Sequence, residues 1–167
     1  MLRFNAAWYQ KSSAYSSDTV KSITCGHKGR QNLTAESGLK MKKQAKTATV
    51  LLVEDTEDNR FMMRRLLEMT GYRVIEAMNG EEAVKLAQTE LPQLILMDLS
   101  LPVIDGLAAT RLIRKLPDFK STPIIAVSAH DTSDFQSEAI AAGCNSYVTK
   151  PIDFNELEQL IGQLLQR

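Results

Sequence analysis

Short apolar runs punctuate the chain from residue 49 onward and predict five β-strands. The clearest is Val50-Leu51-Leu52-Val53, which is continuously apolar, as expected for a strand covered on both faces of a parallel sheet. The predicted strands lie at residues 50–53, 72–76, 94–97, 124–127 and 146–148.

Longer stretches with helical spacing follow the apolar runs and predict five helices. The first is expected around residues 61–69, with an apolar stripe formed by Phe61, Met62, Leu66, Leu67 and Met69. The others are expected at 80–90, at 106–116, from the polar cluster 131–134 to Gly143, and from 153–156 to about Leu164.

Alternation of five strands with five helices predicts a doubly wound α/β domain. Each right-handed crossover lays a helix back over a parallel sheet, so helices cover both faces. Ligands in such sheets bind beyond the carboxyl ends of the strands, where the strand order reverses. Polar residues at those strand ends are therefore the first candidates for a functional site.

The first 46 residues lack this periodicity and are rich in Ser, Thr, Gly and Lys. We expect a disordered extension over residues 1–46 and a folded domain over 47–167. Three origins stay open for the extension: a start codon assigned too early, with Met41 the true start; a basic targeting peptide; or a functional tail.

Charge and cysteine content limit the kinds of partner and the cellular compartment that we expect for this chain. Residues 1–40 carry six Lys or Arg and two acidic residues, whereas residues 41–167 carry 14 and 18, so the folded part is acidic by four charges. An acidic domain argues against nucleic-acid binding, and no apolar stretch reaches the length of a membrane span. Cys25 and Cys144 form neither a disulfide framework nor a zinc pattern, so we expect the reducing cytoplasm.

Four of the predicted strands end in residues with chemically useful side chains. Glu54 and Asp55 follow the first strand, Asp98 the third, Ser128 the fourth and Lys150 the fifth. Three carboxylates at one edge of the sheet repel each other unless a cation neutralises them. Mg²⁺ prefers such oxygen ligands and brings phosphate oxygens with it.

These side chains fit phosphoryl transfer onto a carboxylate. An Asp can act as a nucleophile that is transiently phosphorylated, and catalysis of that transfer is mostly positioning and charge neutralisation. The metal, the Lys150 ammonium and the Ser128 hydroxyl would each serve one phosphoryl oxygen. The second strand alone contributes no polar residue to this set.

Four segments together resemble the signatures of response-regulator receiver domains. They are Val-Glu-Asp at 53–55, Met-Asp-Leu-Ser-Leu-Pro-Val-Ile-Asp-Gly at 97–106, Ala-Val-Ser-Ala at 126–129 and Tyr-Val-Thr-Lys-Pro at 147–151. The resemblance covers about residues 48–166. It implies a flavodoxin-like sheet with strand order 2-1-3-4-5 and a cis peptide bond between Lys150 and Pro151.

The resemblance also implies a role for each site residue. Asp98 would be the phosphoacceptor, contacted by Lys150. Asp55, Asp98 and the Ser100 backbone carbonyl would bind Mg²⁺ directly, and Glu54 would bind it through water.

Three further positions would act in switching. Ser128 would move toward the phosphoryl group, and Tyr147 would then turn inward and change the surface of the fourth helix, fifth strand and fifth helix. Ser100 and His130 occupy places that tune the lifetime of the phosphoryl group in this family.

Such a protein is a signalling switch that catalyses its own phosphorylation and dephosphorylation. Its donor would be a sensor histidine kinase or a histidine phosphotransfer protein, and its target would dock on the fourth-helix, fifth-strand, fifth-helix surface. Only 17 residues follow Lys150, so we expect no DNA-binding output domain. The sequence leaves open whether the protein is a terminal switch or a phosphorelay shuttle.

Two other functions compete with this interpretation. Haloacid-dehalogenase-like phosphatases also form an aspartyl phosphate, but they need an Asp two residues after the nucleophile, where this chain has Ser100. A pseudo-receiver would keep the fold without phosphorylation. Retention of the acidic residues, Ser128 and Lys150 argues against that alternative.

Overall fold

A computed structural model describes residues 47–166, in which strands and helices alternate. The strands are β1 (Thr49–Val53), β2 (Arg73–Ala77), β3 (Leu94–Asp98), β4 (Ile124–Ser128) and β5 (Ser146–Thr149). The α-helices are α1 (Glu57–Met69), α2 (Gly80–Glu90), α3 (Gly106–Lys115), α4 (Ser133–Ala142) and α5 (Phe154–Leu165), and a 3₁₀ turn, η2 (Pro117–Phe119), follows α3.

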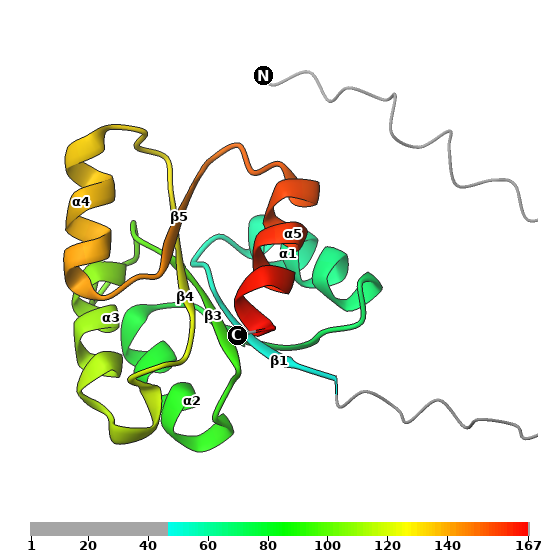
Figure 1. Cartoon of the computed structure of the whole chain (residues 1–167), viewed down its shortest axis with the longest axis horizontal. Coiled ribbons are helices and arrows are strands. Elements are labelled where there is room, and N and C mark those ends of the chain that lie inside the picture. The colour runs from blue at the N-terminus through cyan, green and yellow to red at the C-terminus, as the bar shows by residue number, and fades with distance from the viewer. Residues whose placement is uncertain (1–46, 167) are drawn as a thin grey trace, which may run out of the picture. The chain divides into compact units, whose positions relative to one another are not determined.

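The strands form one parallel sheet in the order β2-β1-β3-β4-β5, which confirms the predicted fold class. Val53 pairs with Met97 and Asp98 pairs with Val127, so the ends of the three central strands lie at the same edge. Figure 1 shows α1 and α5 on one face of the sheet and α2, α3 and α4 on the other.

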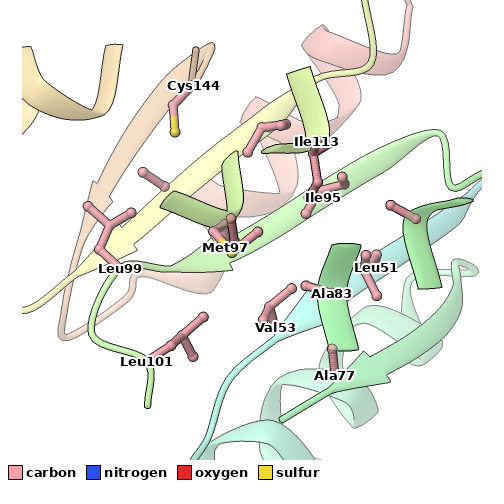
Figure 2. Packing of buried hydrophobic residues seen from close by; sticks show 14 of the residues in the cluster. Leu51, Val53, Ala77, Ala83, Ile95, Met97, Leu99, Leu101, Ile113 and Cys144 are labelled. Atoms are coloured by element: carbon pink, nitrogen blue, oxygen red, sulfur yellow. The ribbon is translucent and has the colours of Figure 1, made fainter. Parts of the chain in front are cut away.

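Alternating residues of each strand build two apolar clusters, one on each face of the sheet. In β1, Leu51 and Val53 pack with residues of α2, α3 and α4, as Figure 2 shows for part of that cluster. Val50 and Leu52 point to the other face and pack with residues of α1 and α5. Burial on both faces explains why this strand is apolar at every position.

Local signals set several helix ends as predicted. The side chain of Asn79 accepts a hydrogen bond from the backbone N–H of Glu82, and the carboxylate of Glu82 accepts one from the N–H of Met78, which is a capping box. Asp153 caps α5 by accepting from two backbone N–H groups. Gly71 and Gly143 adopt positive φ angles after α1 and α4.

The predicted apolar stripe of α1 is wrong in part. Phe61 and Met69 are 57% and 81% exposed, and Met62 is exposed as well. The buried positions are Met63 and Leu67, which lie one helical turn apart on the face toward the sheet. Apolar composition alone did not distinguish that face from the neighbouring one.

The predicted extension over residues 1–46, with its alternative start at Met41 and with Cys25, lies outside the residues that the structure describes. Among the helices of residues 47–166, none is long and apolar enough to span a membrane.

Candidate functional site

Three acidic side chains meet at the carboxyl edge of the sheet, as the sequence predicts. Glu54 and Asp55 follow β1, and Asp98 is the last residue of β3. One carboxylate oxygen from each lies within 4.8 Å of the others. Glu54 and Asp98 are only 6% and 4% exposed, whereas Asp55 faces solvent. Such a cluster carries negative charge into a partly buried place, which favours binding of a cation.

Lys150 supplies a positive charge from the loop after β5. Its Nζ lies 2.6 Å from Asp98 Oδ2 and 2.8 Å from Glu54 Oε2. Burial lowers the pKa of this ammonium, but the hydrogen bonds and charges of Asp98 and Glu54 outweigh burial, and the pKa is raised above its ordinary value. Lys150 therefore stays charged at neutral pH. The peptide bond to Pro151 is cis, as the resemblance implied.

The loop after β3 fixes the carboxylate of Asp98. The backbone N–H of Ser100 donates to Asp98 Oδ1 at 2.8 Å, while Oδ2 accepts from Lys150. The loop then returns so closely that a Cβ atom at Gly106 would lie 2.0 Å from the backbone oxygen of Asp98. Both oxygens of this buried side chain are thus oriented by hydrogen bonds.

Ser128, His130 and Tyr147 form a second group beside the acidic residues. Ser128 is buried, and its Oγ accepts a hydrogen bond from the backbone N–H of His130 at 3.1 Å. The Tyr147 hydroxyl donates to the backbone oxygen of His130. The His130 ring stacks on Phe135 of α4, with 4.2 Å between centroids. Hydrogen bonds therefore link the two predicted switch residues through His130.

The donor set at this edge fits Mg²⁺. Carboxylate oxygens are the ligands that this hard cation prefers, and it is commonly held by one or two carboxylates together with waters and phosphate oxygens. Asp55 is the exposed member of the cluster, where a hydrated ion can reach it. The single ammonium of Lys150 balances only part of the charge of three carboxylates.

Some residues around the site were not found from the sequence. Asn59 donates from Nδ2 to Glu54 Oε1 at 3.2 Å, and Arg60 donates to the backbone oxygens of Glu54 and Asp55. Both belong to the first turns of α1 and point back to the end of β1. A spacing of five or six residues is no recognised signal, because the contact depends on how the turn between β1 and α1 folds.

A sequence profile described as "Response regulator receiver domain" matches residues 50–162 of this chain. The chain belongs to the response regulator receiver family. This receiver is 38% identical over 104 residues to the polar-differentiation response regulator DivK of Brucella anthropi, a match that covers 62% of the chain and 85% of DivK. It is 41% identical over 117 residues to hybrid signal transduction histidine kinase G of Dictyostelium discoideum, which covers 68% of the chain but only 3% of that kinase.

Solved structures agree with the family. The receiver domain of sensor histidine kinase PA1611 from Pseudomonas aeruginosa, which has a magnesium ion coordinated in its active site cleft, is 35% identical with a TM-score of 0.69, and the match covers 72% of this chain and 99% of that one. A putative response regulator from Chloroflexus aurantiacus is 32% identical with a TM-score of 0.70, over 73% of this chain and 100% of the other.

Proposed function

We propose that this receiver accepts a phosphoryl group onto Asp98 in a Mg²⁺-dependent reaction and signals through protein contacts. The observation that carries the proposal is the position of the Lys150 ammonium, which bridges Asp98 and Glu54 beside the exposed carboxylate of Asp55. A buried, oriented carboxylate next to an ammonium and a cation site has the parts that phosphoryl transfer needs.

In the reaction, a carboxylate oxygen of Asp98 attacks the phosphorus of a phosphohistidine. The bond from phosphorus to the imidazole nitrogen breaks, and its electron pair stays on the imidazole. Lys150 stabilises the negative charge on the phosphoryl oxygens, and the Ser128 hydroxyl donates to one of them. The chain therefore contributes mainly orientation and charge.

Asp55, Asp98 and the Ser100 backbone carbonyl would hold the metal directly, and Glu54 would hold it through water. When bound, Mg²⁺ supplies positive charge against the phosphoryl oxygens and lets an anionic donor approach an anionic acceptor. Support comes from the three converging carboxylates and from the related Pseudomonas receiver, which has a magnesium ion in its cleft.

Switching would follow from the second group of residues. Movement of Ser128 toward the phosphoryl group would break its hydrogen bond with the backbone N–H of His130. Tyr147 would then turn inward, because its hydroxyl is bonded to the backbone oxygen of the same histidine. The surface of α4, β5 and α5 would change and bind the downstream target. Water would remove the phosphoryl group within the same site, so the protein would act as its own phosphatase. Ser100 and His130 would set the rate of this hydrolysis.

The donor would be a sensor histidine kinase or a histidine phosphotransfer protein in the cytoplasm. Matches to a hybrid histidine kinase, to the receiver domain of a sensor histidine kinase and to DivK support this class of partner.

Phosphorylation by acetyl phosphate with Mg²⁺ tests the proposal directly. Asp98→Asn should abolish incorporation of acid-labile phosphate, measured by intact-protein mass spectrometry, whereas Asp118→Asn, which changes an exposed carboxylate of η2, should leave it unchanged. Undiminished incorporation in Asp98→Asn would place the acceptor elsewhere. Absence of incorporation in the unaltered protein, with either acetyl phosphate or a phosphohistidine donor, would favour a pseudo-receiver.

A further inference from the structure

Strand β2 provides no ligand to the acidic site, yet a side chain from this strand is connected to it. Glu76, the fourth residue of β2, forms ion pairs with two arginines of α1. Its Oε1 lies 3.5 Å from Arg60 Nε, and its Oε2 lies 3.4 Å from Arg64 Nε. The carboxylate therefore holds the first turns of α1 against β2.

The Arg60 guanidinium also contacts the residues of the acidic site. Its Nη1 donates to the backbone oxygen of Glu54 at 2.9 Å and to that of Asp55 at 3.2 Å. The side chain is only 13% exposed, although it belongs to a surface helix. One planar group thus joins β2 to the two peptide units that carry the acidic side chains after β1.

Within the described residues, the turn between β1 and α1 lacks one common support, a side-chain cap at the start of the helix. Thr56 is the N-cap residue of α1, but among residues 47–166 its side chain makes no capping hydrogen bond. The usual device that fixes the start of a helix is therefore not used here. Arg60 instead holds the backbone oxygens of Glu54 and Asp55, the two residues before Thr56 that carry the acidic side chains.

We propose that Arg60 and Glu76 are positioning residues of the metal site: Glu76 orients Arg60, and Arg60 fixes the turn that presents Glu54 and Asp55 to Mg²⁺. This inference rests on the proposed function of the site. Arginine suits the task because its planar fork serves acceptors in different directions at once, whereas the ammonium of a lysine is a single point charge.

Mg²⁺ affinity, measured by calorimetry, and order of the turn in the metal-free protein, measured by ¹⁵N relaxation at Asp55 and Thr56, test the proposal together. Arg60→Met should raise the Kd for Mg²⁺ about tenfold or more, as loss of a residue that orients metal ligands commonly does, and should loosen the turn. The Mg²⁺ affinity and the order of the turn in Arg60→Lys should lie between those of the unaltered protein and those of Arg60→Met. Glu76→Gln should weaken binding less, and it should add nothing in the Arg60→Met background, because Glu76 acts through Arg60.

A matched control is the exposed pair Arg65 and Glu68 on the same helix, whose side chains are 3.4 Å apart. Arg65→Met and Glu68→Gln should change neither Mg²⁺ affinity nor the turn. Additive effects of Glu76→Gln and Arg60→Met would overturn the pathway through Arg60. Unchanged turn dynamics and unchanged Mg²⁺ affinity in Arg60→Met would overturn the whole inference.

The two readouts separate this inference from the proposed function. If the unaltered protein fails to bind Mg²⁺, the metal-dependent function is wrong, and the relaxation data on the metal-free turn still decide whether Arg60 fixes it. If the unaltered protein binds Mg²⁺ and Arg60→Met binds it equally well with a rigid turn, only the positioning role is wrong.

Discussion

Cys144 shows how one side chain's surroundings decide its chemistry. It is 5% exposed and packs in the apolar cluster with α3 and α4 (Figure 2), with its Sγ 3.9 Å from Thr110 Oγ1. Burial raises the pKa of the thiol, and neither the hydrogen bond with Thr110 nor the charge of Arg114 reverses that effect. The residue behaves as a small apolar group rather than as a nucleophile.

Alkylation measures this directly in a Cys25→Ser variant, where Cys144 is the remaining cysteine. At pH 8, iodoacetamide should modify Cys144 far more slowly than a free thiol, whose pKa is about 8.5. The rate should rise only at higher pH, since the thiolate is the reactive form. Denaturing urea should restore ordinary reactivity, and rapid alkylation of the native protein would contradict the burial.

The same raised pKa links Cys144 to stability. The folded protein holds the thiol proton more tightly than the unfolded chain does, which contributes to the free energy of unfolding. This contribution is fully present below the pKa of the unfolded thiol, near 8.5, and is lost as pH rises through the pKa of the folded protein.

At the scale of elements, the start of α3 is packed against the end of β3. The backbone N–H of Gly106 donates to the oxygen of Leu99 at 3.2 Å, so the loop between β3 and α3 closes on itself. The close approach of Gly106 to the backbone of Asp98 leaves no room for a side chain. Helix position and acceptor position are therefore coupled through one residue.

Substitution of two glycines tests that coupling. Gly106→Ala should destabilise the fold by about 2 kcal/mol, as overpacking against backbone does, and should reduce phosphorylation because Asp98 is displaced. Gly162→Ala, within α5, should stabilise by about 0.5–1 kcal/mol, since among the described residues no atom other than the neighbouring residues and the backbone of the helix itself lies within 4 Å of the added Cβ. Urea unfolding gives both values. Equal stability of the two variants would show that the loop yields without cost.

At the scale of the whole molecule, Lys150 joins three strands of the sheet. Its ammonium, from the end of β5, contacts Glu54 after β1, which lies 96 positions away in the chain, and Asp98 at the end of β3. Two largely buried carboxylates depend on this charge in the absence of metal. The two ion pairs thus tie the edge strand β5 to the ends of the inner strands β1 and β3.

Lys150→Met should leave both carboxylates without their cation and lower the free energy of unfolding by about 2–3 kcal/mol, a value reduced for the partial exposure of the ammonium. Added Mg²⁺ should stabilise this variant more than it stabilises the unaltered protein, because the metal replaces missing positive charge. Lys85→Met, which changes an exposed side chain of α2, is the control. Equal responses to Mg²⁺ in all three proteins would contradict the shared role of Lys150 and the metal.

Much of the fold could be predicted because its signals are local. The uniformly apolar pattern of β1, the capping box at Asn79 and Glu82, and the glycines after α1 and α4 each act within a few residues. The buried faces of the helices were harder to predict: the apolar stripe expected on α1 included Phe61 and Met69, which are exposed. Apolar residues on adjacent faces have similar spacing, and only packing against the sheet decides between them.

The residue types expected at the site could be read from the chain, since an acidic pair, a lone Asp, a hydroxyl and a lysine each end a predicted strand, and parallel strands end at one edge. Which of these groups touch became known only from the packed fold. The contacts of Lys150 with Asp98 and Glu54, and the contacts of Arg60 with the turn after β1 and with Glu76, depend on side-chain directions across separate elements. Residue spacing carries no information about such contacts, because hydrogen bonds need ångström-scale placement that arises only when the sheet and its helices are packed together.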